Sequence, residues 1–136
     1  MIATLLLAVA LQASLDAQAR EHNCADPQAQ LDMNFCAELD FERADAELNR
    51  IYRQEVADAR RMDQEIERSV DQRPTSEAML REAQRAWVTF RDAQCTYEGY
   101  QEARGGSMEP MVYHGCRARL TRERIAQLNP PAEEAH

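Results

Sequence analysis

The absence of glycine and proline between residues 28 and 72 constrains the fold more than any other feature of this sequence. Apolar residues recur in this segment with a 4-3-4-3 spacing, which gathers them on one face of an α-helix. They are Ala37, Phe41, Ala44, Leu48 and Ile51, continued by Tyr52, Val56, Ala59, Met62, Ile66 and Val70. The pattern predicts one helix of about forty residues, longer than one compact domain usually covers. It is expected to begin near residues 29–32, with a second half that protrudes or bends.

A second helix is predicted after the break at residues 71–75, with Thr75 or Ser76 as its cap and an end near Tyr100. A 3-4-3-4-3 spacing places six of its residues on one stripe, namely Leu80, Ala83, Trp87, Phe90, Gln94 and Tyr97. Five of the six are apolar or aromatic, so the stripe is predicted to face the core rather than to form a ligand site. Five charged residues of this segment lie outside the stripe: Arg81, Glu82, Arg85, Arg91 and Asp92.

A third helix is predicted after the loop at residues 104–110, with Ser107 as a candidate N-cap. It ends before Asn129 because the two prolines that follow cannot continue a helix. Its inward residues are Tyr113, Cys116, Leu120, Ile125 and Leu128. No strand pattern is present. The sequence thus predicts an all-α bundle of about three helices with a long first helix, and a core that includes Leu48, Trp87, Phe90 and Leu120.

The first 13 residues are apolar except for Thr4 and Gln12. This length suits the apolar region of a secretory signal peptide and is too short for a mature membrane span, which needs roughly 20 residues. Small residues at Ala17 and Ala19 predict cleavage after residue 19, with cleavage after Ala13 as an alternative. The expected organisation is a signal peptide at 1–19, a helical domain at 20–130 and a disordered tail at 131–136. No membrane anchor is expected in the mature form, which should be periplasmic or secreted.

Four cysteines in a short exported chain predict two disulfides. A zinc site is disfavoured because there is no C-x-x-C pair and the histidines are scattered. Three pairings are conceivable. The midpoint of Cys95 and Cys116 falls between Gly105 and Gly106, so two antiparallel helices joined there would bring these cysteines together. Cys24 and Cys36 would then form the second bridge.

Charge and motifs exclude several functions. The chain carries 24 acidic and 16 basic residues, and all the basic ones are arginine. Without the predicted signal peptide the net charge is −7, which argues against nucleic-acid binding and is compatible with a cationic protein partner. The sequence contains no phosphate-binding glycine loop and no hydrolase or metalloprotease motif. We therefore predict no catalytic residues, no metal and no cofactor.

Three blocks of sequence resemble one known family. They are residues 30–37 (QLDMNFCA) with 44–52 (ADAELNRIY), residues 80–95 (LREAQRAWVTFRDAQC), and a C-terminal block that includes Gly106, Pro110, Cys116 and the helix Leu120 to Leu128. In order and spacing they resemble the family named for the lysozyme inhibitor LprI, over nearly the whole mature chain. The resemblance implies a small exported helical domain with these four cysteines.

The chain departs from the family pattern in three ways. It lacks the lipid-attachment cysteine of the family's founding lipoprotein, it ends just after the shared domain, and Ala29 stands where a capping threonine is common. The first two departures bear on membrane anchoring and on inhibition. The third weakens a helix cap, by about 1 kcal/mol.

Two functions are predicted from these observations. The first is binding and inhibition of a cationic, lysozyme-type glycosidase through the loop around Ser107 and Glu109, which the Cys95–Cys116 bridge would hold rigid. The alternative is an envelope structural or adaptor module that binds another protein through the long acidic helix, with residues 38–62 as the binding segment. The first assigns the partner contact to a loop, and the second assigns it to a helix face.

Overall fold

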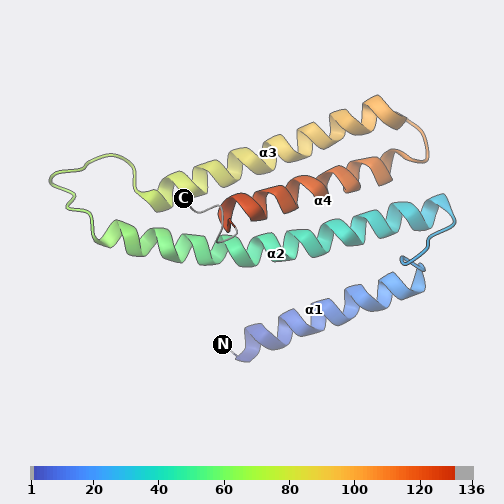
Figure 1. The fold of residues 1–136 in the computed structure, drawn as a ribbon, viewed down its shortest axis with the longest axis horizontal. Coiled ribbons are helices and arrows are strands. Elements are labelled where there is room, and N and C mark those ends of the chain that lie inside the picture. The colour runs from blue at the N-terminus through green and yellow to red at the C-terminus, as the bar shows by residue number, and fades with distance from the viewer. Residues whose placement is uncertain (1, 131–136) are drawn as a thin grey trace.

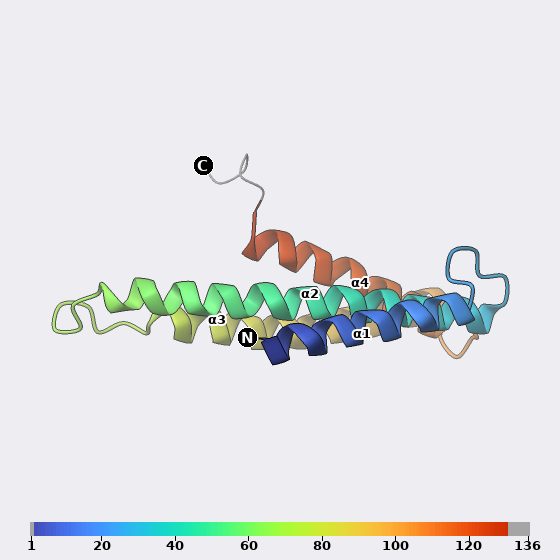
Figure 2. The ribbon, with the colours of Figure 1, turned by 90° about the horizontal axis from the view of Figure 1, so that it is seen from below.

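The computed structural model describes residues 2–130, which form four α-helices: α1 (Ile2–Glu21), α2 (Gln30–Gln64), α3 (Ser76–Ala103) and α4 (Glu109–Leu128). The fold is all-α, as predicted. Helices α2, α3 and α4 form the bundle, while α1 lies along the outside of α2 (Figure 1). The predicted tail at 131–136 lies outside the described residues. Helix α4 is the shortest of the bundle and covers only one end of α2 and α3 (Figures 1 and 2).

Helix α2 supplies most of the core. Six of its seven buried side chains lie on the predicted stripe, namely Phe41, Ala44, Leu48, Ile51, Val56 and Ala59, and the seventh, Leu39, was not predicted. Leu48 is 1% exposed. The predicted length was wrong, because α2 ends at Gln64 and Val70 is 80% exposed. Helix α4 does not reach this end of α2 (Figure 1), so a longer helix would have had no second partner to bury its apolar face.

The end of α2 caps the start of α3. The side chain of Thr75 accepts a hydrogen bond from the amide of Ala78, at 3.2 Å, so Thr75 is the N-cap as expected. The carboxylate of Asp63, near the end of α2, accepts hydrogen bonds from the amides of Ser76 and Glu77, at 2.8 and 3.0 Å. At the N-terminus of α3, three backbone amides that lack a partner within the helix thus donate hydrogen bonds, two of them to a side chain of α2.

Replacing Asp63 with alanine is expected to destabilise the α2–α3 connection in a pH-dependent way. The hydrogen bond from the Glu77 amide, with that from Ser76, lowers the pKa of Asp63 below its ordinary 3.8. A lowered folded-state pKa stabilises the fold above the ordinary value, and this contribution is lost as the pH falls through the folded-state pKa. Thermal unfolding followed by circular dichroism should therefore show a gap between wild type and Asp63→Ala at pH 7 that shrinks below about pH 4. Glu55→Ala, on the same helix, serves as the control, and a pH-independent gap would contradict the capping role.

The inward face of α3 differs from the predicted stripe. Its buried residues are Gln84, Arg91, Cys95 and Gly99. Phe90 is 55% exposed, so its assignment to the core was wrong, and Tyr97 is 56% exposed. Trp87 and Leu120 are only partly buried. Apolar residues occur on both sides of α3, and the side that carries Cys95 must face α4 because the disulfide connects these helices. The face with Phe90 and Tyr97 is consequently turned outward.

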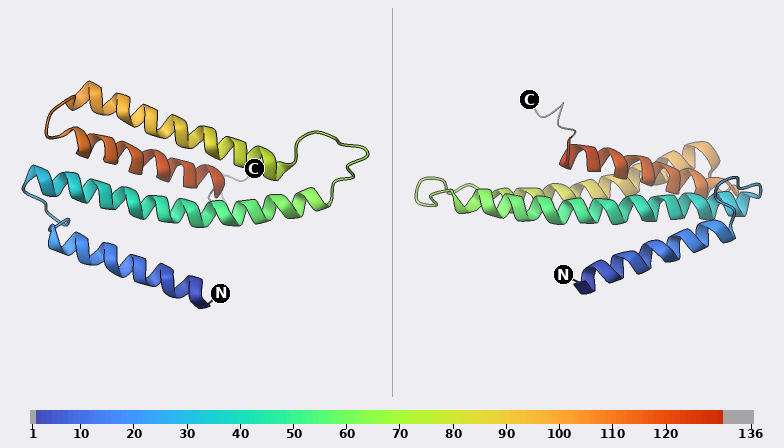
Figure 3. Two further views of the ribbon diagram at one scale, coloured as in Figure 1. Left: turned by 180° about the vertical axis from the view of Figure 1, so that it is seen from behind. Right: turned by 60° about the horizontal axis from the view of Figure 1, so that its bottom comes forward.

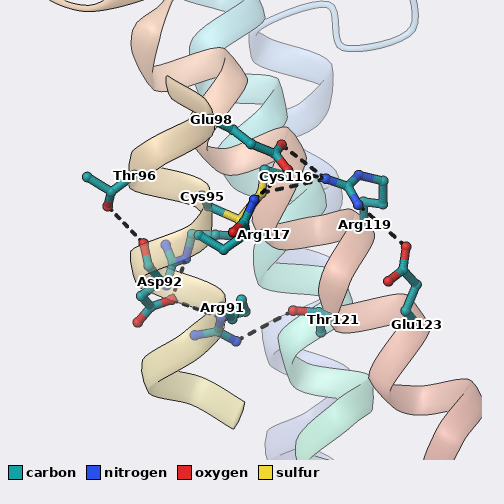
Figure 4. The surroundings of a disulfide bond; sticks show 11 residues. Arg91, Asp92, Cys95, Thr96, Glu98, Cys116, Arg117, Arg119, Thr121 and Glu123 are labelled. Carbon is teal, nitrogen blue, oxygen red and sulfur yellow. Dashed lines mark hydrogen bonds and ion pairs between the residues drawn. A yellow bond between two sulfur atoms is a disulfide. The ribbon is translucent and has the colours of Figure 1, made fainter. Parts of the chain in front are cut away.

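Arg91 is buried within the bundle, although the sequence-based prediction placed it outside the core-facing stripe. It is 5% exposed and donates to Asp92 at 2.9 Å, to Asp45 at 3.2 Å and to Thr121 at 3.5 Å. Its guanidinium also lies over two aromatic rings, 5.0 Å from the centroid of Phe41 and 5.1 Å from that of Trp87. Figure 4 shows Arg91 with Asp92 and Thr121, near the Cys95–Cys116 disulfide. The charge is buried because both carboxylates and the rings compensate it.

Both predicted disulfides are present. Cys95 and Cys116 join α3 to α4, and their side chains are almost fully buried. Cys24 and Cys36 join the segment after α1 to the first turns of α2. In the oxidising compartments where such bonds persist, one bridge ties the segment after α1 to α2 and the other ties α3 to α4.

Helix α1 is apolar yet mostly exposed. Leu15 is its one buried residue, and Asp16 forms an ion pair with Arg43 of α2 at 2.7 Å. The leucines of its first half stand in solvent, with Leu5 and Leu7 both 71% exposed. Figure 3 shows α1 diverging from the bundle toward its N-terminus. Of the helices in residues 2–130, α1 is the one whose length and composition would allow it to cross a membrane, and a signal sequence meets the same criteria.

Candidate functional site

The turn between α3 and α4 is held by several hydrogen bonds. Gly105 adopts a φ of +76°, a conformation that other residues seldom adopt. Its amide donates a 2.6 Å hydrogen bond to the carboxylate of Glu109, and the amide of Gly106 donates to the carbonyl of Ala103 at 2.8 Å. The carboxylate of Glu109 therefore reaches back and holds the turn closed. Glu109 thus stabilises the turn by a hydrogen bond, in addition to the favourable interaction of an acid with the N-terminal end of the α4 dipole.

A second contact connects this turn to α2. The side-chain amide of Asn34 donates a hydrogen bond to the backbone carbonyl of Ser107 at 2.8 Å. The prediction of Ser107 as N-cap was wrong, because α4 begins at Glu109 after Met108 and has no side-chain cap. The anchoring of its carbonyl by Asn34 gives Ser107 a different role and leaves its side chain exposed. The loop is thus fixed by α2 as well as by the disulfide.

A shallow hollow of about 440 Å³ lies against this turn. It is lined by Gly105, Gly106, Glu109, Pro110, Tyr113 and His114. The rings of Tyr113 and His114 pack edge to face, with their centroids 5.0 Å apart. The hollow thus combines an acidic group, two rings and exposed glycine backbone. Such a combination suits the docking of a protein side chain better than the enclosure of a small molecule.

His114 is partly buried at the edge of the hollow. Burial lowers its pKa below the ordinary 6.5, against the opposing effect of Glu38, and the charge of Arg117 lowers it further. The buried Nδ1 atom of its ring has no hydrogen-bond partner within residues 2–130. The lowered pKa favours the uncharged ring, so His114 adds little positive charge to the hollow.

Of the two predicted partner-binding residues, Glu109 lines the hollow and Ser107 lies on the adjacent loop. The sequence-based prediction did not include Tyr113 and His114 in the site. Tyr113 follows Glu109 by four residues, one helical turn, so this spacing would have indicated it. His114, five residues after Glu109, had no such signal in the sequence. Across the described part of the chain, no group of His, Cys, Asp or Glu side chains is arranged to hold a metal ion.

These features define a class of protein: a small, disulfide-bonded helical domain with a hydrogen-bonded loop and an open hollow at one end. The apolar α1 suggests a signal peptide, and the disulfides are consistent with a location outside the cytoplasm.

Residues 21–128 match the family described as "Lysozyme inhibitor LprI", and the chain belongs to this family. It is also 44% identical, over 131 residues, to an uncharacterized protein of Rhizobium meliloti (strain 1021). That match covers 96% of this chain and 94% of the relative. No solved structure is similar to the chain at a significant level. Membership in a family of lysozyme inhibitors suggests a protein partner.

Proposed function

We propose that this protein binds and inhibits a lysozyme-type glycosidase through the α3–α4 turn, and that it has no catalytic activity of its own. The observation that carries the proposal is the rigidity of the turn, which the Glu109 carboxylate, the Asn34 side chain and the nearby disulfide hold in one conformation. A preformed loop loses little conformational entropy on docking, and this favours affinity.

Charge supports the choice of partner. The chain carries a formal net charge of −8, and lysozyme-type enzymes are expected to be cationic if they act on anionic cell walls. Exposed acids steer such a partner toward the surface, while the hollow beside Tyr113 and His114 can receive one of its side chains. Arg104 stacks on the ring of Tyr100 at 4.3 Å, so the one arginine of the loop lies against α3.

The decisive experiment is the hydrolysis of cell walls by lysozyme in the presence of the protein purified from the periplasm. Stoichiometric inhibitor should abolish turnover, and the inhibition should weaken as salt rises because screening reduces charge attraction. Unchanged turnover at stoichiometric excess would disprove the proposal.

Variants of the turn separate the two uses of Glu109. Glu109→Gln keeps an acceptor for the Gly105 amide and removes the charge, whereas Glu109→Ala removes both. We expect Tyr113→Ala and Glu109→Ala to weaken inhibition about tenfold or more, the usual effect of losing an interface anchor. Ser107→Ala should add a smaller loss. Glu123→Gln, an exposed acid elsewhere on α4, is the matched control and should inhibit like wild type. Equal effects at Glu109 and Glu123 would show that only net charge matters.

The alternative, an adaptor that binds through the acidic face of α2, has weaker support. Several acids of residues 38–62 are already paired within the chain. Asp40 pairs with Arg122, Asp45 with Arg91, and Glu47 with Arg50. A partner at this face would have to displace arginines that the bundle itself supplies, at a cost in affinity.

A further inference from the structure

The outward face of α3 carries an apolar stripe that the fold does not use. Seven residues repeat on it with a 4-3-4-3-4-3 spacing, and all are exposed: Met79, Ala83, Ala86, Phe90, Ala93, Tyr97 and Tyr100. Figure 1 shows α3 at the edge of the bundle, and no other described element covers this face. Apolar residues at heptad spacing form the seam of a coiled coil when a second helix is present. We propose that this face binds α3 of a second copy of the chain, giving a symmetric antiparallel dimer.

The order of small and large residues along the stripe supports this occupant. A two-fold axis between residues 91 and 92 would place Phe90 opposite Ala93 of the second copy. The same axis pairs Ala86 with Tyr97, and Ala83 with Tyr100. Every ring then faces an alanine, because Ala83, Ala86 and Ala93 each lie opposite one of the three rings. A parallel arrangement would instead put ring against ring and alanine against alanine, which fills space poorly.

The polar groups beside the stripe are already satisfied within the helix. The hydroxyls of Thr89 and Thr96 donate to the carbonyls of Arg85 and Asp92, at 3.2 and 2.8 Å. The Tyr97 oxygen accepts a hydrogen bond from the side chain of Gln101 at 2.9 Å. Covering this face would therefore leave none of these groups without a partner.

Charge distinguishes a second copy from other occupants. The stripe is flanked by the neutral residues Thr89, Thr96, Gln94 and Gln101, in a chain in which 29% of residues are charged. Helices that bind membrane surfaces carry lysine and arginine beside their apolar face, and a cationic protein would require acids there. At the two ends of the stripe, Arg104 of one copy comes within a helical turn of Glu82 of the other, an arrangement of opposite charges that the two-fold axis repeats.

The exposed area predicts a weak, reversible dimer. Phe90, Tyr97, Tyr100 and Met79 are each 44–56% exposed. An aromatic side chain carries roughly 150–250 Å², so these four present on the order of 400 Å² per copy. With the alanines and the neutral flanks, a symmetric pair would bury about 1,200 Å² in total, at the lower limit of specific interfaces. We expect association at micromolar to millimolar concentrations.

Sedimentation velocity of the protein purified from the periplasm, at concentrations up to about 1 mM, tests the proposal over the range where weak complexes form. Wild type should change from monomer to dimer. Ala86→Glu places a charge in the seam and should raise the dissociation constant at least tenfold, whereas Ala57→Glu, the same change at an exposed site on α2, should leave it unchanged. A wild-type monomer at every concentration, or equal behaviour of the two variants, would overturn the proposal.

Exchanging one pair across the seam tests the antiparallel arrangement. Ala86→Tyr alone would place a tyrosine ring against Tyr97 of the other copy, and Tyr97→Ala alone would place two alanines opposite each other and leave a gap. Each single variant should therefore weaken association. The double variant restores one ring facing one alanine and should dimerise like wild type. Positions 86 and 97 lie three helical turns apart within one chain, so only a second copy can couple them. A double variant no tighter than the single ones would overturn the pairing.

Discussion

Replacing Cys95 and Cys116 together with alanine should lower the free energy of unfolding by about 3 kcal/mol or more, the largest effect expected from any change in this protein. The bridge closes a loop with a sequence separation of 21 residues, and its loss increases the entropy of the unfolded chain. Both sulfur-bearing side chains are almost completely buried, so alanine also leaves a small cavity between α3 and α4. Urea unfolding followed by far-ultraviolet circular dichroism measures the loss.

The second disulfide provides the comparison. Cys24 and Cys36 are separated by 12 residues and lie at the edge of the bundle, where neither sulfur-bearing side chain is fully buried. The loss of unfolding free energy from alanine at both positions should be about 1 kcal/mol smaller than the loss for Cys95 and Cys116, because the closed loop is shorter and little core volume is lost. Inhibition of lysozyme should also respond differently, because only the Cys95–Cys116 bridge stabilises the α3–α4 turn. Equal losses of stability from the two double variants would contradict this assignment.

Replacing Arg91 with alanine should be the second most damaging change, at about 3 kcal/mol. It removes hydrogen bonds to Asp45, Asp92 and Thr121 and uncovers the rings of Phe41 and Trp87 at the centre of the bundle. The two carboxylates are 38% and 42% exposed, so water can partly solvate them, which limits the cost. Urea unfolding is again the measurement.

Two further variants at this position show what the arginine contributes. Arg91→Lys keeps the charge, but an ammonium group cannot reach several acceptors in one plane. We therefore expect it to lower the free energy of unfolding by at least half as much as Arg91→Ala does. Arg91→Met fills most of the volume without a charge and should lie within about 1.5 kcal/mol of wild type, since buried ion pairs are often replaceable by apolar residues. If Met were as damaging as Ala, the ion pairs rather than the packing would carry the stability.

Part of the candidate site was predictable from the sequence. The midpoint of Cys95 and Cys116 located the turn, which contains Ser107 and is followed directly by Glu109, the two residues predicted to contact a partner. The use of Glu109 to hold the amide of Gly105 was not predictable, because it depends on the φ of +76° at that glycine. The hydrogen bond from Asn34 to the Ser107 carbonyl could not be predicted either, because the two residues are 73 positions apart in the chain.

The sequence by itself determined the features that depend on near neighbours: the helical class, a cap at Thr75 or Ser76, the breaks at glycine and proline, and the pairing of cysteines about a turn. Capping and turn formation act over a few residues, and helical periodicity can be read directly from the order of residues. Only the tertiary structure decided the end of α2 at Gln64, the burial of Arg91 and the outward position of Phe90. Each of these depends on which helices are present to cover a given face. Since α3 has apolar residues on two sides, its own pattern could not select the inward one, and the disulfide to α4 made that choice.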